Sequence, residues 1–256
     1  MNRLSLIVLG GLFAGCSSDP QTPETTLDAG TDVVVVQDAA IDVATPKDAG
    51  VDAPASCTAA KETLLKPIDS ISTGEVTILG DTGGVRTLFV DATAGGSQGA
   101  ATNPRIYVDL ATGQRVDVTD KTAHTSTAWD LAIKRPVFFT NGGDGGPGTG
   151  GAAFLDGKDF ATVVAADATG KTFSPESFFE SDCTPKLDAT GAVKTSFDGW
   201  YDYDQQKNAL SPHPGTFLVK GPTGKLYRLR IKGYYATADG GVGPSGGRYL
   251  LDVAPL

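Results

Sequence analysis

The chain has 256 residues, of which 40% are hydrophobic, and its formal net charge at pH 7 is −9. This acidic balance argues against a nucleic-acid-binding protein, which requires a basic surface. The 3 Cys and 2 His are also too few and too scattered for a zinc site, which requires clustered ligands.

The N-terminus has the pattern of a bacterial lipoprotein signal. Residues 1–15, MNRLSLIVLGGLFAG, hold one Arg, an apolar run and then small residues, and are too short to span a membrane. The stretch LFAGC resembles a lipobox, in which cleavage before Cys16 is followed by acylation of that cysteine. Several acyl chains, such as palmitate, anchor a protein stably where a single chain does not. By resemblance to lipoproteins, the Ser after Cys16 favours the outer membrane, on its outer or periplasmic face. The alternative is an ordinary cleaved signal followed by an unrelated Cys.

Residues 16–57 are expected to form an acidic tether ahead of the domain. Three ten-residue blocks, LDAGTDVVVV, QDAAIDVATP and KDAGVDAPAS, each carry two Asp. They lack the glycine and the terminal Glu of a calcium loop, so the repeat predicts an extended, disordered linker. Residues 17–57 hold eight acidic residues and one Lys, net −7, and Arg3 adds +1, so the total of −9 leaves −3 for residues 58–256. The domain itself is therefore only mildly acidic.

Two cysteines remain once Cys16 is assigned to the lipid anchor. Cys57 and Cys183 form a single pair in an exported chain, which is most simply a disulfide. The bond would join the start of the domain to its middle. Two free thiols are the alternative.

Residues 58–256 predict one all-β, antiparallel domain. A short helix is expected near its start, in ASCTAAKETLLKPI, and Gly-Pro-Thr-Gly at 221–224 predicts a hairpin turn. Runs rich in apolar or aromatic residues and bounded by turn residues predict strands. These runs are 74–80, 85–92, 105–112, 128–135, 136–141, 199–204, 216–221, 225–236 and 248–254.

The chain is poorly supplied for catalysis. It has no GxSxG motif and no free thiol once the two domain cysteines pair, so we expect no enzyme. The glycine-rich run TNGGDGGPGTGGAAF (140–154) lacks the Lys and the following helix of a phosphate-binding loop. A calcium site at Asp144 is an alternative role for this run, although the sequence has no further carboxylates nearby to complete it. Another is a glycan-stacking platform in GWYDYD, formed by Trp200, Tyr201 and Tyr203, unless these side chains belong to the core or rim of a sheet.

Haem iron is the remaining candidate for the histidines. Its axial ligands in proteins are imidazole, thioether, thiolate or phenolate groups. The only Met is Met1, which is lost with the signal, so a bis-His site would use His124 and His213. His213 lies between two prolines in SPHPG, and His124 lies in the polar stretch DKTAHTSTA. For each of them, an exposed and simply solvated histidine is the alternative.

Four segments, taken in chain order, resemble the HmuY family of bacterial surface lipoproteins. They are RIYVDLATGQRV (105–116), WDLAIKR (129–135), TNGGDGGPGTGGAAF (140–154) and GWYDYDQQKNALSPHPGTFLVKGPTGKLYRLRIKGYY (199–235), and the likeness covers roughly residues 100–256.

The resemblance implies an all-β fold that holds haem between protruding β elements. It also implies a surface protein that captures haem for iron acquisition without catalysis, with an outer-membrane receptor as a possible partner. It does not supply the ligand pair. His213 falls in the closing segment, where a family histidine is plausible, whereas His124 matches no family ligand. The alternative function is a surface module that binds a glycan or a partner protein.

Overall fold

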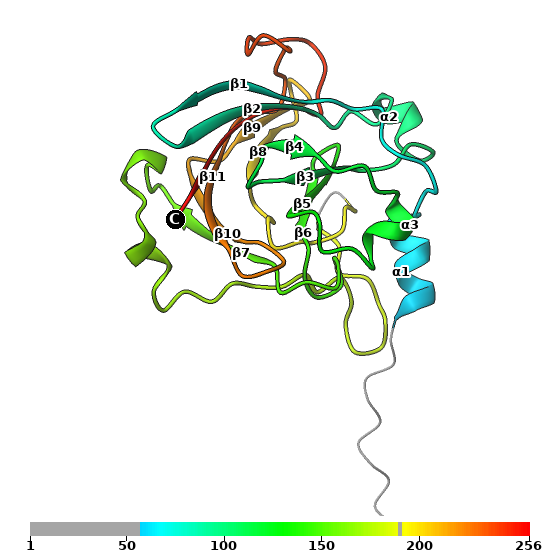
Figure 1. Cartoon of the computed structure of the whole chain (residues 1–256). Helices are drawn as coiled ribbons and strands as arrows, with labels where there is room; N and C mark the ends of the chain where they lie inside the picture. Colours follow the sequence, from blue (N-terminus) through cyan, green and yellow to red (C-terminus); the bar gives the residue numbers. More distant parts are fainter. Residues whose placement is uncertain (1–56, 189–190) are drawn as a thin grey trace, which may run out of the picture. The chain divides into compact units, whose positions relative to one another are not determined.

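Two antiparallel β-sheets form the core of the computed structural model, which describes residues 57–188 and 191–256 (Figure 1). The predicted signal peptide, Cys16 and nearly all of the predicted tether lie outside the described residues. Among the described residues, no helix is long and apolar enough to span a membrane.

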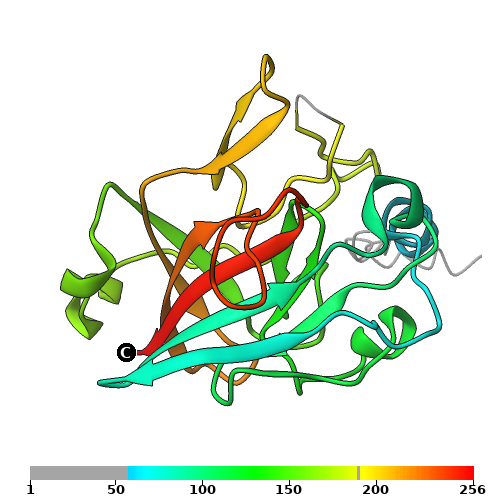
Figure 2. The same cartoon turned by 90° about the horizontal axis from the view of Figure 1, so that it is seen from above.

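The larger sheet has six strands, in the order β1 (Val76–Thr82), β2 (Val85–Asp91), β12 (Arg248–Pro255), β11 (Leu226–Gly233), β10 (Gly215–Lys220) and β7 (Gly151–Asp156). The smaller sheet has four strands, in the order β4 (Gln114–Arg115), β3 (Ile106–Asp109), β5 (Leu131–Lys134) and β6 (Val137–Thr140). A separate hairpin of β8 (Tyr201–Asp204) and β9 (Ala209–Pro212) projects from the domain (Figure 2). The short helical elements are α1 (Thr58–Leu65), α2 (Gly96–Gly99), α3 (Asp120–Ala123), η1 (Phe160–Thr162) and η2 (Ala165–Ala168).

The predicted all-β, antiparallel class is confirmed, because every pair of neighbouring strands runs antiparallel. Each of the nine predicted strand segments contains a strand, and α1 lies where the helix was expected. The predicted turn at 221–224 joins β10 to β11 and is closed by a hydrogen bond from Gly221 N–H to the carbonyl of Lys225, at 2.8 Å. In β11 the buried side chains alternate, with Tyr227, Leu229 and Ile231 facing inward.

The sequence prediction missed the two-residue strand β4 as well as β7 and β9. β7 begins with Gly-Ala-Ala and β9 ends in Pro212, and these residues are weak strand formers. Tertiary pairing compensates for this, because β7 pairs with β10 through six consecutive residue pairs, from Gly215–Asp156 to Lys220–Gly151. The glycine-rich run therefore ends inside a sheet.

Apolar side chains from both sheets fill the space between them. The main cluster includes fully buried residues of β2, β3, β5, β11 and β12, such as Leu88, Val108, Ile133, Leu229 and Leu251. Burial of this apolar surface is the main stabilising contribution to such a two-layer fold.

A second cluster, centred on Trp129, covers the other face of the smaller sheet. Trp129 is fully buried and packs edge-on against Tyr107 and Phe139, with ring centroids 5.0 and 6.0 Å away. Its indole N–H donates to the carbonyl of Ala123 at 3.0 Å. Leu64 of α1 packs against the same cluster. Trp129 thus anchors the sheet, as the strand prediction around it implied.

The predicted disulfide is present in the structure. Cys57 and Cys183 are bonded, with their Cα atoms 5.4 Å apart. The bond ties the residue that precedes α1 to the long loop between η2 and β8. None of the residues of α1 is fully buried, so this covalent link supplements its limited packing.

Two buried polar side chains shape the glycine-rich run. The amide of Asn141 donates to the carbonyl of Trp129 at 2.9 Å and accepts from Gly148 N–H at 3.1 Å. Glu176, 2% exposed, accepts hydrogen bonds from the backbone and side chains of Thr140 and Ser196. Gly143 has φ +59°, and a β-carbon there would lie 2.1 Å from the carbonyl oxygen of Glu176. This glycine is required because the backbone passes so closely.

Candidate functional site

His213 lies in the link between β9 and β10. Its backbone N–H donates to the carbonyl of Trp200 at 2.8 Å, which extends the pairing of the β8–β9 hairpin by one step. Pro212 and Pro214 flank it, and each proline ring restricts its own backbone angle. The backbone of His213 is therefore held in place although the segment is on the surface.

Two carboxylates flank the imidazole of His213. Its Nδ1 lies 3.3 Å from Oδ2 of Asp202, and its Nε2 lies 3.4 Å from Oδ1 of Asp156. The ring of Phe154 lies edge-on to it, with centroids 6.0 Å apart. The His213 side chain is 38% exposed, and those of Asp202 and Asp156 are 72% and 79% exposed. The ring is thus oriented by its neighbours but remains accessible from solvent.

No local sequence signal pointed to these carboxylates. Asp202 is brought to His213 by the β8–β9 hairpin, in which it pairs with Ser211. Asp156 is brought there by the pairing of β7 with β10. Since β7 and β9 are among the strands that the sequence prediction missed, the surroundings of His213 could not be predicted either.

Aromatic rings continue from His213 into the core. Phe154 packs against Phe217 at 4.6 Å, and Phe217 against Phe197 at 4.7 Å. Phe217 and Phe197 are both buried, at 3% and 0% exposed, and belong to the main cluster between the sheets. Phe154, beside His213, is half-buried, so the row of rings reaches the surface at the histidine.

The stretch GWYDYD does not present three aromatic rings to solvent. Trp200 is 3% exposed and its indole N–H donates to the carbonyl of Pro136 at 2.8 Å, so it belongs to the core. Tyr201 is half-buried. Tyr203 is 45% exposed, and its hydroxyl donates to Asn208 at 2.8 Å. No observation on these residues favours a glycan-stacking platform.

The structure does not bring His124 to His213. His124 is the exposed residue that ends α3, and α3 lies near α1 on the right in both Figure 1 and Figure 2. His213 contacts Asp156 at the end of β7, which leads into η1 on the left in both views. None of the contacts of His213 involves α3 or its end, so the structure shows no approach of the two imidazoles among the described residues.

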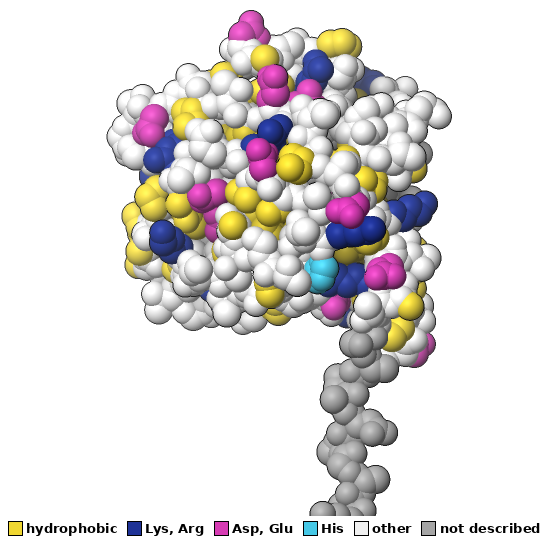
Figure 3. All heavy atoms as spheres, turned by 45° about the vertical axis from the view of Figure 1, so that its right-hand side comes forward, with side chains coloured by type: hydrophobic (Ala, Val, Ile, Leu, Met, Phe, Trp, Pro, Cys, Tyr) yellow, Lys and Arg dark blue, Asp and Glu magenta, His cyan; other side chains and the backbone are white. Residues whose placement is uncertain are grey.

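The described residues contain no group of three or more His, Cys, Asp and Glu side chains that could hold a metal ion. Asp144, the alternative calcium ligand, accepts a hydrogen bond from Phe178 N–H at 2.6 Å and so closes a loop. Two pockets, of about 430 and 240 Å³, have no histidine in their lining. On the face in Figure 3, acidic and basic side chains are interspersed and form no single basic patch.

A family model described as HmuY protein matches residues 101–244, more than half of the chain. The chain belongs to the HmuY family. The match includes the glycine-rich run, the β8–β9 hairpin and His213, but it ends before β12. No curated protein matched the chain.

Three solved structures resemble the chain at low identity. A putative lipoprotein from Bacteroides fragilis is 18% identical, with 70% of this chain and 94% of that chain covered and a TM-score of 0.44. A putative HmuY-like heme-binding protein from Bacteroides vulgatus is 17% identical, with coverages of 67% and 91% and a TM-score of 0.45. An apo HmuY analog from Tannerella forsythia is 14% identical, with coverages of 73% and 100% and a TM-score of 0.41.

Proposed function

We propose that this HmuY-family protein is a lipid-anchored surface protein that binds haem, with His213 as a ligand of the iron. Cys16 would carry the lipid anchor, and the captured haem would serve iron acquisition without any turnover. Membership of the family supports haem as the ligand, and the surroundings of His213 support the position.

The observation that carries the proposal is the exposed imidazole of His213 between two carboxylates. Histidines that ligate metals almost always donate their second ring N–H to a carboxylate, a carbonyl or water, which orients the ring and makes the ligand more basic. Asp202 and Asp156 each offer this partner, one to each ring nitrogen. Because both carboxylates are largely exposed, either can move aside and leave one nitrogen for the iron while the other stays hydrogen-bonded.

The side chains of the domain can supply one axial ligand to a haem iron, the imidazole of His213. Residues 58–256 contain no Met, so a thioether ligand is excluded there, and Cys183 is held in the disulfide. Phe154, whose ring centroid lies 6.0 Å from that of His213, offers apolar surface beside it for the flat macrocycle. Haem would supply the iron that His213 ligates, and the protein would bind and orient it.

The proposal does not include His124, because both imidazoles of a bis-His site must approach one iron to about 2 Å and the contacts of His213 involve no residue of α3 or its end. The proposal therefore rests on His213. The second axial position would be filled by another donor, and His124 becomes the natural comparison in any test.

The test is a titration of the purified protein with hemin, followed by absorbance. Binding at a defined site predicts a Soret band that shifts and saturates near one equivalent of hemin. A protein that leaves the spectrum of free hemin unchanged contradicts the proposal. That result would favour the alternative, a surface module for a glycan or a protein partner.

A further inference from the structure

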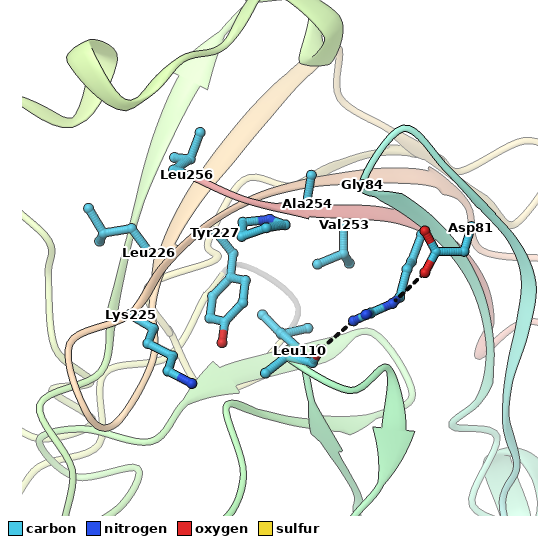
Figure 4. A pocket seen from close by; sticks show the side chains of 12 residues that line it. Asp81, Gly84, Leu110, Lys225, Leu226, Tyr227, Val253, Ala254 and Leu256 are labelled. Carbon is cyan, nitrogen blue, oxygen red and sulfur yellow. Dashed lines mark hydrogen bonds and ion pairs between the residues drawn. The ribbon is translucent and has the colours of Figure 1, made fainter.

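A pocket of about 430 Å³ opens between the two sheets, away from His213 (Figure 4). It is lined by the β1–β2 strand pair, by the turn after β3 and by the ends of β11 and β12. Pockets for small ligands commonly have volumes of about 300–1,000 Å³. Neither His213 nor any residue that contacts it lines this pocket, so it is separate from the haem site proposed above.

The floor of the pocket is apolar. It includes Leu110, Val253 and Ala254, which are 1–3% exposed and belong to the turn after β3 and to β12. At the rim, the guanidinium of Arg86 is already engaged, with its Nε 3.0 Å from Asp81 and a further hydrogen bond to the carbonyl of Ala111. The charges of Arg86 and Asp81 neutralise each other. The rim therefore does not require a charged group at this place, and an apolar molecule can enter the pocket.

Two hydrogen-bond donors at the pocket have no partner within the described part of the chain. The first is the hydroxyl of Tyr227, a residue that is only 3% exposed. The second is the ammonium of Lys225, which forms no ion pair or hydrogen bond there. Figure 4 shows the two side chains extending in the same direction, toward the segment that carries Leu110. The buried side-chain nitrogen and oxygen atoms without a partner in the described residues all belong to arginines, so the Tyr227 hydroxyl opens to the pocket, where an acceptor from outside can reach it.

The hydroxyl of Tyr227 is a donor throughout the physiological pH range. Its burial, followed by the carboxylates of Asp130 and Asp109, raises the pKa of Tyr227 to about 12. It therefore stays protonated. Lys225 provides the positive charge beside it.

We propose that this pocket binds a small amphipathic carboxylate. The apolar body lies against Leu110 and Val253, and the carboxylate accepts hydrogen bonds from Lys225 and Tyr227. A carboxylate fits better than a neutral head group because it accepts from both donors at once and pairs with the free ammonium. The inference is independent of haem binding.

The test uses octanoate as the probe, titrated into the whole protein by calorimetry below its micelle concentration, with 1-octanol as the uncharged comparator. Octanoate is expected to saturate one site. Lys225→Met should weaken octanoate binding by about tenfold or more, because hydrogen bonds to charged groups are among the stronger ones, and should leave octanol binding nearly unchanged. Asp130→Asn removes a nearby negative charge. It should therefore tighten the binding of octanoate and leave the binding of octanol unchanged.

Two further variants keep the result interpretable. Tyr227→Phe removes only a hydroxyl without a partner, so it should leave the free energy of unfolding unchanged while it weakens octanoate binding. Lys121→Met, on the 57% exposed side chain of Lys121 in α3, is the matched control and should bind as the wild type does. Absence of saturable octanoate binding by the wild type would overturn the inference. Equal octanoate affinities in Lys225→Met and Lys121→Met would overturn it as well.

Discussion

Asp130 is a buried carboxylate whose charge opposes folding at neutral pH. It is 6% exposed, and its Oδ2 accepts a hydrogen bond from Leu110 N–H at 2.7 Å. Burial raises the pKa of Asp130 from 3.8 to about 6, although the hydrogen bond from Leu110 opposes the shift. Asp109 contributes in the same direction as burial, and Lys225 against it.

The size and sign of the effect follow from these two pKa values. One pH unit corresponds to about 1.4 kcal/mol, so the difference between 3.8 and about 6 is worth roughly 3 kcal/mol. The folded state binds this proton more tightly than the unfolded state does. The stabilisation is therefore fully present below about pH 3.8, is lost as the pH rises to about 6 and stays lost above that.

Asp130→Asn should stabilise the protein at neutral pH. The asparagine is uncharged and keeps a carbonyl oxygen that can accept from Leu110 N–H. We expect the free energy of unfolding at about pH 7.5 to rise by roughly 1–3 kcal/mol, because a weaker neutral hydrogen bond offsets part of the gain. At about pH 3.5 the variant and the wild type should differ little, because Asp130 is then protonated in both states.

Urea unfolding followed by tryptophan fluorescence at the two pH values measures this difference. Asp198→Asn is the matched control, because Asp198 is exposed, and it should change the free energy of unfolding by less than about 0.5 kcal/mol at either pH. The reasoning is refuted if Asp130→Asn changes stability by the same amount at both pH values.

Three further predictions concern the stability of the fold. Gly143→Ala should lower the free energy of unfolding by about 1–3 kcal/mol more than Gly157→Ala, because a β-carbon at Gly143 (φ +59°) lies 2.1 Å from a carbonyl oxygen and one at Gly157 (φ +63°) has nothing within 4 Å; equal losses in urea unfolding would contradict this. Replacing Cys57 and Cys183 by Ser should cost about 3–5 kcal/mol, since the disulfide closes a loop with a sequence separation of 126 residues, and a loss below about 1 kcal/mol would count against it. Burial raises the pKa of Glu176 above 4.5, so stability should fall as the pH rises beyond about 4.5, and Glu176→Gln should flatten that fall; an unchanged slope would be evidence against the buried charge.

Most of the fold could be predicted because its strands carry their own signals. The apolar runs around Leu88, Ile133 and Leu229 are long enough to identify strands, and turn residues separate them. The chain order of β11 and β12 at the end of the domain was predicted, but the pairing of β12 with β2 was not, since a sequence contains no direct record of which strands pair. β7 was missed because Gly-Ala-Ala resembles a loop until pairing with β10 makes it a strand.

The candidate site was harder to predict than the fold. The residue types pointed to His213 and His124 because the chain has no other histidine. Their positions depend on tertiary structure, which places His124 at the end of α3 and His213 beside Asp156 and Asp202. No sequence pattern indicated the pocket around Tyr227, because its lining comes from segments more than 100 residues apart in the chain.

The central claim is that His213, and not His124, ligates haem iron. The most direct measurement is the absorbance spectrum of hemin bound to His213→Ala and to His124→Ala, each compared with the wild type. We expect the Soret band of His213→Ala to shift and the affinity for hemin to fall, while His124→Ala keeps the wild-type spectrum. Identical spectra and affinities for His213→Ala and the wild type would contradict the account.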